Sequence, residues 1–599
     1  MKFPKAILAA LLAAIVLTGC GDPDIVLTPQ KTEDTSQTGG QATVDSASLF
    51  TDRDRSGDYS QSDARQILLS GNTASSTAAS VKITGSTVTV TEEGVYILTG
   101  TLEDGMVIVE ADKTEKVQLV LAGVSIHSET SAAVYVRQAD KVFVTLAPGT
   151  ENTLSNGGSF VAIDENNIDS VIFSKDDLTL NGSGSLTVES PAGHGVVSKD
   201  DLTVAGGSYS LTCASHGFTA NDLLAVTEAS VTVVSGKDGL HAENNEDTAL
   251  GNLVVESGSF HITAQGDGIS AGGTLQIIDG SFTVVSGGGS ANAAEKTADQ
   301  FGGGRGGMGP GSMGGGRPGG GGFGGFGGEP ESSAEEDTGS AKGIKSTGDM
   351  LLLGGTFAID SADDAIHSNA NITFCGGSYE LSTGDDGVHA DEKLILSGGR
   401  VIVSESYEGL EGLSVEITGG DVTLVSSDDG LNAAGGTDQS GFGGFHGSDR
   451  FGSGGSSDSY VRISGGSITL RSSGDGIDSN GSLEITGGTV TVCGPTQGDT
   501  AVLDYDTTGT ISGGIFIGTG SYMMAQSLSS SGEQGVIALS VGNQSAGTEI
   551  ILTDSGGNVI LSHTPERDFA IVILSSPNIR VGESYTVTIG SASGTFEAG

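Results

Sequence analysis

The feature that most constrains the fold of this chain is a repeat of about 22 residues between positions 342 and 488. Acidic bends recur at Asp364, Asp386, Glu408 and Asp429, at separations of 386 − 364 = 22, 408 − 386 = 22 and 429 − 408 = 21 residues. A short period of this kind is typical of solenoids. The runs between the bends alternate in polarity and are broken by Gly, Asn, Asp and Ser, which favours short strands and turns over helices. The repeat therefore predicts an all-β parallel β-helix with coils of about 22 residues. Each unit closes on a glycine pair: Gly354-Gly355, Gly376-Gly377, Gly398-Gly399, Gly419-Gly420, Gly465-Gly466 and Gly487-Gly488.

Aligning the units places equivalent residues in four columns. The first column is mostly charged and contains His194, His216, Asp238, Asp267, Lys342, Asp364, Asp386, Glu408, Asp429 and Asp475. The second is glycine except at Ala365, as expected where a bend needs a positive φ or a close approach of two backbones. The third is apolar and must point inward: Val196, Phe218, Leu240, Ile269, Ile344, Ile366, Val388, Leu410, Leu431 and Ile477. The fourth is polar: Thr219, His241, Ser270, Lys345, His367, His389, Glu411, Asn432 and Asp478.

These columns predict a ladder of carboxylates along one edge of the solenoid. Neighbouring coils lie about 4.8 Å apart. Two unit charges at that distance repel by roughly 3 to 4 kcal/mol at an effective dielectric near 20. We expect a hard divalent cation to offset this repulsion.

The net charge of the 599-residue chain is −49, which argues against nucleic acid as a partner, because a polyanion needs a basic surface. The acidic excess suits calcium. It would repel an acidic polysaccharide unless metal ions bridge the two. The chain has no Trp, so stacked Trp rings cannot form a cellulose-binding platform, although Tyr could serve.

Residues 1–20 have the pattern of a bacterial lipoprotein signal peptide. Lys2 and Lys5 precede an apolar core, and the run Leu17-Thr-Gly-Cys20 ends in the cysteine that would become lipid-modified. We therefore expect an exported protein that is anchored through Cys20 to the extracytoplasmic face of the bacterial cell membrane. Residues 21–44 are a linker without periodicity.

The parallel β-helix is predicted to occupy residues 45–533, with glycine-rich insertions at 287–340 and 435–459. Residues 301–328 are mostly glycine and cannot form a core. The 22-residue pattern is lost in residues 534–599, but strand-like runs continue. We predict a C-terminal β cap there, because the last coil of a solenoid exposes a strand edge that invites aggregation.

The motifs Gly343-Ile-Lys-Ser346, Tyr407-Glu-Gly-Leu-Glu-Gly412 and Ser426-Ser-Asp-Asp-Gly-Leu-Asn432 resemble the bacterial carbohydrate-binding domain-containing proteins. A Gly/Met/Phe-rich insertion just before the first motif adds to the likeness, which runs from about residue 45 to the cap. The resemblance implies a right-handed parallel β-helix similar in shape to family 9 pectate lyases. It also implies calcium bound by aspartates at the bends, and recognition of plant cell-wall polysaccharide, cellulose or polygalacturonate, without established catalysis. The calcium ligands would come from Asp363, Asp364, Asp385, Asp386, Asp428, Asp429, Asp475 and Asp478.

The leading hypothesis is thus a monomeric, lipid-anchored binding protein for a polysaccharide, and no enzyme. The enzymatic alternative is a calcium-dependent polysaccharide lyase of the pectate-lyase kind, with Lys345 in the fourth column as the base. Its acidic neighbours would keep such a lysine protonated, which is a poor state for a base. A further alternative is a surface stalk or adhesin with a protein partner.

Overall fold

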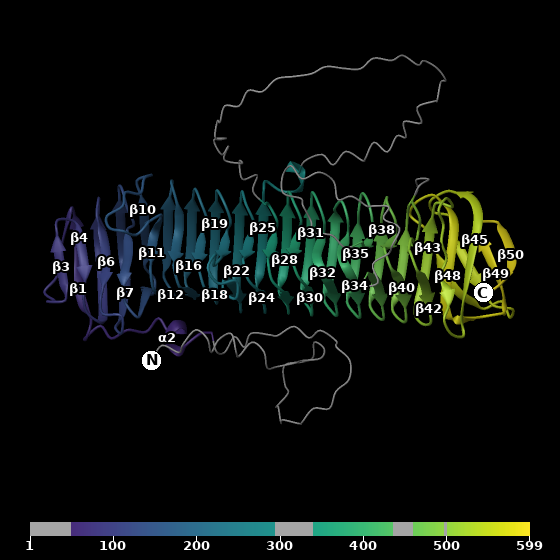
Figure 1. Cartoon of the computed structure of the whole chain (residues 1–599), viewed down its shortest axis with the longest axis horizontal. Coiled ribbons are helices and arrows are strands. Elements are labelled where there is room, and N and C mark those ends of the chain that lie inside the picture. Colours follow the sequence, from purple (N-terminus) through teal and green to yellow (C-terminus); the bar gives the residue numbers. More distant parts are fainter. Residues whose placement is uncertain (1–48, 294–339, 435–458, 496–499) are drawn as a thin grey trace, which may run out of the picture.

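The computed structural model describes residues 49–293, 340–434, 459–495 and 500–599. These residues form a long rod of stacked coils that runs from the N-terminal to the C-terminal end of the chain (Figure 1). Each regular coil contributes one strand to each of three parallel sheets, which we name A, B and C in the order in which the chain visits them. The predicted all-β parallel β-helix is confirmed.

The strands of each sheet are paired in parallel from coil to coil. Sheet A contains β10 (Glu151–Asn156), β13 (Ser185–Ser190), β16 (Ser208–Cys213), β19 (Ala229–Ser235), β22 (Gly258–Ala264), β25 (Ser281–Ser286), β28 (Thr356–Ser361), β31 (Ser378–Thr383), β33 (Arg400–Glu405), β35 (Asp421–Val425), β38 (Ser467–Arg471), β41 (Thr489–Cys493) and β43 (Ile515–Gly520). Sheet B contains β4 (Thr87–Val90), β6 (Met106–Glu110), β8 (Val134–Gln138), β11 (Ser170–Ser174), β14 (His194–Ser198), β17 (Phe218–Ala220), β20 (Leu240–Ala242), β23 (Ile269–Ala271), β26 (Ile344–Ser346), β29 (Ile366–Ser368), the first halves of β32 (Val388–Leu396) and β34 (Leu410–Ile417), β36 (Leu431–Ala433) and β39 (Ile477–Ser479).

Sheet C contains β1 (Arg65–Gly71), β5 (Gly94–Leu102), β7 (Lys116–Ser128), β9 (Lys141–Leu146), β12 (Asp177–Gly182), β15 (Asp201–Ala205), β18 (Leu223–Thr227), β21 (Asn252–Val255), β24 (Leu275–Ile277), β27 (Met350–Leu352), β30 (Ile372–Phe374), the second halves of β32 and β34, β37 (Tyr460–Ile463), β40 (Ser482–Ile485), β42 (Thr508–Ile511) and β44 (Ser529–Ser530). The long strand β7 continues past sheet C and pairs with β10 of sheet A. A short 3₁₀ helix, η3 (Ser290–Asn292), follows β25.

The columns derived from the repeat match the pairing of the strands. Phe218 of β17 pairs with Leu240 of β20, and His241 pairs with Ser270, so neighbouring members of a column stand opposite each other. Every residue of the apolar third column is at most 1% exposed, which confirms that this column points into the core. Aromatic rings of sheet A also stack inside the core, with centroids 4.6 to 4.7 Å apart from Phe260 through Phe282 and Phe357 to Tyr379.

The glycines of the second column are needed for close packing and not for a positive φ. Gly409 has no positive φ, but a Cβ there would collide with the carbonyl oxygen of Gly430 in the next coil and with Leu424. Positive φ occurs instead in the glycine pairs between sheets C and A, for example 90° at Gly377. Ala365, the exception in the second column, is fully buried.

The N-terminal end carries α2 (Asp52–Arg55), β2 (Thr73–Ser75) and β3 (Val81–Thr84). The side chain of Asp54 is buried against the coils, where Thr179 Oγ1 donates to it at 2.6 Å and Lys141 Nζ lies at 2.7 Å. Helix α2 is thus tied to the side of the solenoid by a buried ion pair. Strand β2 runs antiparallel to β1, and β3 runs antiparallel to β4.

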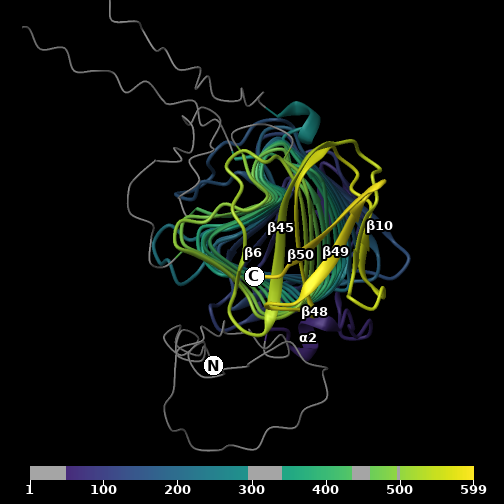
Figure 2. The same cartoon turned by 90° about the vertical axis from the view of Figure 1, so that its right-hand side faces the viewer.

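The C-terminal end is closed by antiparallel strands, so the predicted β cap is confirmed. Strand β48 (Phe569–Arg580) pairs with β43, the last strand of sheet A, and with β45 (Gln534–Gln544). Strands β46 (Ile550–Thr553), β47 (Val559–His563), β49 (Ser584–Ile589) and β50 (Ala592–Glu597) form a second, four-stranded sheet. Figure 2 shows these strands across the end of the rod. The cap covers the strand edge that the last coil would otherwise expose.

Several predicted features lie outside the described residues. These are the signal peptide with Cys20, the whole of the linker, and most of both glycine-rich insertions. No helix in the described part of the chain is long and apolar enough to cross a membrane.

Candidate functional site

The bends between sheets A and B align along one side of the rod, and we call this line of first-column and fourth-column residues the ladder edge. From His216 onward its first-column members lie two residues before a strand of sheet B, and its fourth-column members are the second residue of that strand. An isolated bridge between Ile477 and Leu503 extends the edge by one coil, so Ala501 and Asp504 continue the two columns.

Backbone hydrogen bonds hold the first-column carboxylates in place. Oδ1 of Asp238 accepts the N–H of Asp267 at 2.8 Å, and Oδ1 of Asp364 accepts the N–H of Asp386 at 3.0 Å. Oδ1 of Asp386 in turn accepts the N–H of Glu408 at 3.3 Å. A short carboxylate at this position therefore ties each coil to the next, since hydrogen bonds to a charged acceptor are stronger than neutral ones. This contact offsets part of the repulsion between the acids.

Histidines occupy the N-terminal part of the ladder edge. The rings of His194 and His216 stack with centroids 5.1 Å apart, and those of His216 and His241 with centroids 4.2 Å apart. Asp238 Oδ2 lies 2.7 Å from Nδ1 of His241 and 3.2 Å from Nδ1 of His216. One carboxylate thus faces two imidazoles from neighbouring coils.

A lysine stands among the acids in the middle of the ladder edge. Lys342 Nζ lies 2.6 Å from Asp364 Oδ2 and 3.0 Å from Asp363 Oδ2, and all three side chains are largely buried. Burial acts to raise the pKa of Asp364, but the ammonium of Lys342 and the hydrogen bond from His367 hold it well below its usual value. An oxygen each from Asp363, Asp364 and Asp385 could also reach one metal ion. The ammonium therefore lies beside a carboxylate cluster with metal-binding geometry.

The next coils combine a histidine with two acids. His389 Nδ1 lies 3.2 Å from Asp386 Oδ2 and 2.6 Å from Glu411 Oε2. Burial acts against the charged imidazolium, but the hydrogen bonds that the ring donates to Asp386 and Asp391 raise the pKa of His389 well above its usual value. Burial and the charge of Asp386 raise the pKa of Glu411 to about 8. The sequence interpretation assigned Asp386 to calcium but not its neighbours His389 and Glu411.

The C-terminal part of the ladder edge is dominated by carboxylates. Burial and the charge of Asp475 raise the pKa of Asp429 well above its usual value. Oδ1 of Asp429 accepts the N–H of Asp475 at 2.5 Å. A Cβ on Gly474 would collide with Oδ1 of both Asp428 and Asp429, so a side chain at this position would displace these oxygens.

The amide of Asn432 lies between acidic residues of the two neighbouring coils. Its Nδ2 donates to Glu408 Oε2 at 2.7 Å, and the residue stands opposite Asp478 in the pairing of β36 with β39. Asn432 is 3% exposed, and its Oδ1 has no hydrogen-bond partner among the described residues. Carboxylate oxygens of Asp475, Asp478 and Asp504 lie within 4.8 Å of one another. Only oxygen donors are present in this group, which suits a hard cation.

Five of the eight aspartates expected to bind calcium belong to the ladder edge, and Asp363, Asp385 and Asp428 directly precede its first column. The structure groups most of the eight into three clusters. Asp363, Asp364 and Asp385 form one group, Asp386 joins His389 and Glu411, and Asp475 and Asp478 join Asp504. The sequence interpretation missed Asp504 because the glycine-centred bend motif is absent there. Aligning Ala501-Val-Leu-Asp504 with Asp475-Gly-Ile-Asp478 would have found it.

A second group of acids lies at the bends between sheets B and C. Oxygens of Asp177, Asp200 and Asp201 lie within 4.8 Å of one another. Burial and the charge of Asp177 raise the pKa of Asp201 to about 7. The sequence interpretation did not single out these residues, because they lie outside the four columns of the repeat.

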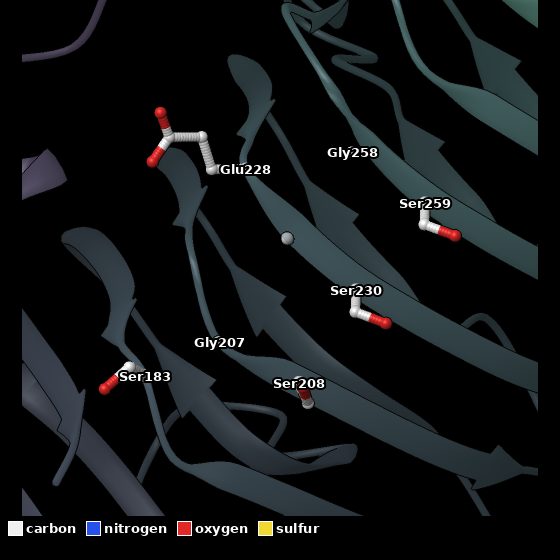
Figure 3. Close-up of a pocket in the computed structure, with 8 residues that line it drawn as sticks. Ser183, Gly207, Ser208, Glu228, Ser230, Gly258 and Ser259 are labelled. Carbon is white, nitrogen blue, oxygen red and sulfur yellow. The ribbon is translucent and has the colours of Figure 1, made fainter. Parts of the chain in front are cut away.

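The outer surface of sheet A is rich in hydroxyl groups. The strands β16, β19, β22 and β25 contain no Asp, Glu, Lys or Arg, although the chain carries a net charge of −49. Pairing places Ser208, Ser230 and Ser259 next to one another on three of these strands, as Figure 3 shows. Their outward hydroxyl residues, exposed or partly exposed, are Ser208, Ser210, Thr212, Ser230, Thr232, Ser259, Thr263, Ser281 and Thr283.

A shallow pocket of about 410 Å³ opens where these strands begin. It is lined by Ser183, Gly207, Ser208, Glu228, Ala229, Ser230, Gly258 and Ser259 (Figure 3). Glu228 has a φ of 53°, in the region that favours glycine, and contributes the one charged side chain of the lining. The pocket therefore offers hydroxyls and a carboxylate, which are groups that bind the hydroxyls of a sugar.

Lys345, the base of the lyase alternative, lies on β26 with a partly exposed side chain. Its Nζ is 3.8 Å from Asp267 Oδ2 and 3.3 Å from Ser340 Oγ. The lysine thus has an acidic neighbour, as the sequence suggested.

A family model described as carbohydrate-binding domain-containing protein matches residues 84–387. A protein of the same description from Acetivibrio thermocellus is 30% identical over 215 residues, which is 35% of this chain and 66% of that protein. The match thus spans just under two thirds of that relative. A solved structure, the gadolinium derivative of the polysaccharide lyase-like protein from C. thermocellum, is 27% identical, with a TM-score of 0.36 over 38% of this chain and 92% of that one.

Proposed function

The chain belongs to the carbohydrate-binding domain-containing protein family, and we propose that it is an exported, lipid-anchored bacterial protein that binds a cell-wall polysaccharide, cellulose or polygalacturonate. Calcium on the ladder edge holds the coils together at their bends. Cys20 is the lipid attachment site, on the extracytoplasmic face of the membrane. The protein acts as a monomer and without catalysis.

The observation that carries the calcium proposal is the buried Oδ1 of Asn432, which has no hydrogen-bond partner among the described residues. A buried amide oxygen without a partner costs about 1–3 kcal/mol, and a calcium ion would remove that cost. The neighbouring carboxylates supply the further oxygens that a six- to eight-coordinate calcium ion requires. Bound calcium would also relieve the repulsion that, together with burial, keeps the pKa of Asp429 high.

The proposed calcium sites differ along the ladder edge. The ammonium of Lys342 already neutralises part of the charge of Asp363 and Asp364. At the C-terminal end, by contrast, the strongest charge acting on Asp429 is the negative charge of Asp475. The tightest site therefore lies around Asp475, Asp478 and Asp504, beside Asp429, and weaker sites lie at Asp363, Asp364, Asp385, Asp386 and Asp428.

The polysaccharide contacts the hydroxyl-rich surface of sheet A and the pocket at its border. Both lie within the segment that the family model matches. A six-residue strand is about 20 Å long, so the surface is wide enough for several sugar units. The four strands carry no acidic side chain and do not repel an acidic glycan, whereas Glu228 in the pocket and the acidic remainder of the protein would.

The test uses the full chain, purified in detergent, and measures its retention on insoluble cellulose and on polygalacturonate with calcium or with a chelator. Ser230→Arg would fill the pocket, and we expect it to abolish retention without changing thermal unfolding. Ser593→Arg, at an exposed position of the cap, is the matched control and should bind normally. Asp429→Asn should weaken calcium binding and remove the calcium-dependent part of the stability.

Three outcomes would contradict the proposal. Retention that Ser230→Arg leaves intact would rule out the pocket as the contact. Release of unsaturated uronate products, abolished by Lys345→Met, would establish the lyase. Absence of retention on both polysaccharides would favour the stalk or adhesin.

A further inference from the structure

The N-terminal part of the ladder edge presents nitrogen donors where the C-terminal part presents only oxygen donors. His194, His216 and Asp238 occupy the first column in successive coils, and His241 follows in the fourth column of the coil of Asp238. The tightest calcium site proposed above lies at the opposite end of the same edge. The two ends therefore differ in the cations that they suit, because imidazole favours Zn²⁺, Cu²⁺ and Ni²⁺ over calcium.

Three ligand atoms converge at this end. Asp238 Oδ2 lies 2.7 Å from His241 Nδ1 and 3.2 Å from His216 Nδ1, and one ligand atom from each of the three residues lies within 4.8 Å of the others. Ligands in a tetrahedral zinc site, at about 2.0–2.1 Å from the metal, stand roughly 3.3 Å apart. The distance from Asp238 Oδ2 to His216 Nδ1 already matches this spacing, and the distance to His241 Nδ1 has to widen to reach it.

Two contacts compete for Nδ1 of His216. This nitrogen accepts the backbone N–H of Asp238 at 3.2 Å, which uses its one lone pair, and a metal ion would take the place of that N–H. The same nitrogen lies 3.2 Å from the carboxylate oxygen of Asp238, which also presents lone pairs. Two acceptors in contact repel each other unless a proton or a metal ion lies between them.

The backbone hydrogen bonds of the ladder edge leave Oδ2 of Asp238 available. Oδ1 of Asp238 accepts the N–H of Asp267, whereas Oδ2 points to the two imidazoles. His241 Nε2, on the far side of the ring, lies 3.4 Å from Glu243 Oε2, a contact that fixes the orientation of the ring. Partners of this kind position metal-binding histidines in known sites.

The site is also accessible. The side chains of His216, Asp238 and His241 are 13% to 15% exposed, whereas those of His367 and His389 are 1% and 4% exposed. An ion can therefore reach the first group from solvent, and a water molecule can complete its coordination.

We propose that His216, Asp238 and His241 bind one divalent transition-metal ion of the Zn²⁺ class, at a site separate from the calcium sites. The ion bridges two coils through His216 and Asp238 and replaces the repulsive contact between them. The two ends of the ladder edge thus bind different classes of cation, because one end presents nitrogen donors and the other presents only oxygen donors. This site does not depend on calcium or polysaccharide binding, so it can hold where the proposed function fails.

The experiment titrates Zn²⁺ into the metal-free full chain in detergent, with calcium present in large excess, and follows binding by calorimetry. We expect a zinc site that calcium does not displace. His216→Ala and His241→Ala should each weaken it by at least about 100-fold, because loss of a second-shell partner alone costs 10- to 100-fold. His261→Ala, at an exposed histidine of β22, is the matched control and should leave binding unchanged.

Asp238→Asn tests the carboxylate separately. The amide oxygen can still accept the N–H of Asp267, so the coils remain tied together while the charge is lost. We expect zinc binding to weaken, and the thermal unfolding midpoint in chelator to fall at neutral pH, because the charged imidazole of His241 loses its carboxylate partner. Zinc binding that is unaffected by Asp238→Asn would overturn the proposed ligand set.

Copper provides a test that needs no substitution. The electron paramagnetic resonance spectrum of the Cu²⁺-loaded protein should show hyperfine coupling to two imidazole nitrogens. A spectrum with oxygen donors only would overturn the proposal, as would zinc binding that survives both histidine substitutions or is fully displaced by calcium. In those cases the three side chains form an ion pair and nothing more.

Discussion

Replacing Lys342 by methionine removes the ammonium group from the middle of the ladder edge and keeps an unbranched side chain. The Lys342 side chain is 6% exposed, and its Nζ lies 2.6 Å from Asp364 and 3.0 Å from Asp363. After the substitution, Asp364 keeps the hydrogen bond with His367 at 2.8 Å and the N–H of Asp386 at 3.0 Å. The main consequence is an under-compensated buried carboxylate.

The magnitude follows from the burial of this ion pair. Removing one partner of a buried pair costs about 3–5 kcal/mol. The charge of Lys342 is one of the causes that lower the pKa of His367, together with burial, so its loss allows His367 to take up a proton. We therefore expect the lower end of the range, about 3 kcal/mol at neutral pH in the presence of a chelator.

Calcium should restore much of this loss. Oxygens of Asp363, Asp364 and Asp385 are close enough to share one metal ion, and Lys342→Met removes the cation beside them. The assay is thermal unfolding followed by circular dichroism, in chelator and in calcium. The calcium-induced rise in the midpoint should be larger in the variant than in the parent protein.

Lys345→Met is the matched control, because Lys345 is 28% exposed and lies 3.8 Å from Asp267. A partly exposed pair of this kind contributes at most about 1 kcal/mol. Equal and small effects of the two substitutions would refute the assignment of Lys342 as a buried counter-ion. A variant that calcium does not stabilise would refute the metal-binding geometry of the aspartates.

Three further predictions concern stability. Burial and the charge of Asp177 raise the pKa of Asp201 to about 7, so this group lowers the stability of the folded protein progressively as pH rises from about 4 to 7. In thermal unfolding, Asp201→Asn should therefore stabilise the protein by roughly 1–4 kcal/mol at pH 8 and change it little at pH 4. Phe282 is 1% exposed and stacked between two rings, so Phe282→Ala should lower the free energy of unfolding by about 3–5 kcal/mol in denaturant titration, and a loss below 1 kcal/mol would contradict the packing. Burial lowers the pKa of His241, but Asp238 and Glu243 raise it to about 9. In chelator, the stability that charged His241 contributes should be complete below about pH 6.5 and disappear towards pH 9. His241→Gln should abolish this pH dependence of the unfolding free energy.

The repeat in the sequence is sufficient to determine the architecture. In a parallel β-helix each residue stands opposite its equivalent in the next coil, so a period in the sequence becomes a column in space. The apolar column from Val196 to Ile477 must therefore point inward, and it does. Loss of the period after residue 533 likewise predicts the antiparallel cap that closes the rod.

The partners of the polar side chains are decided only by the tertiary structure. The sequence assigns Asp364 to calcium, but whether its charge is met by Lys342, 22 residues away, depends on the direction of both side chains. The glycines of the second column are required by contacts between coils, which no local φ preference reveals. The joint approach of His216 and His241 to Asp238 is of the same kind. Periodicity specifies which residues are neighbours, whereas rotamers and burial specify which of those neighbours bind one another.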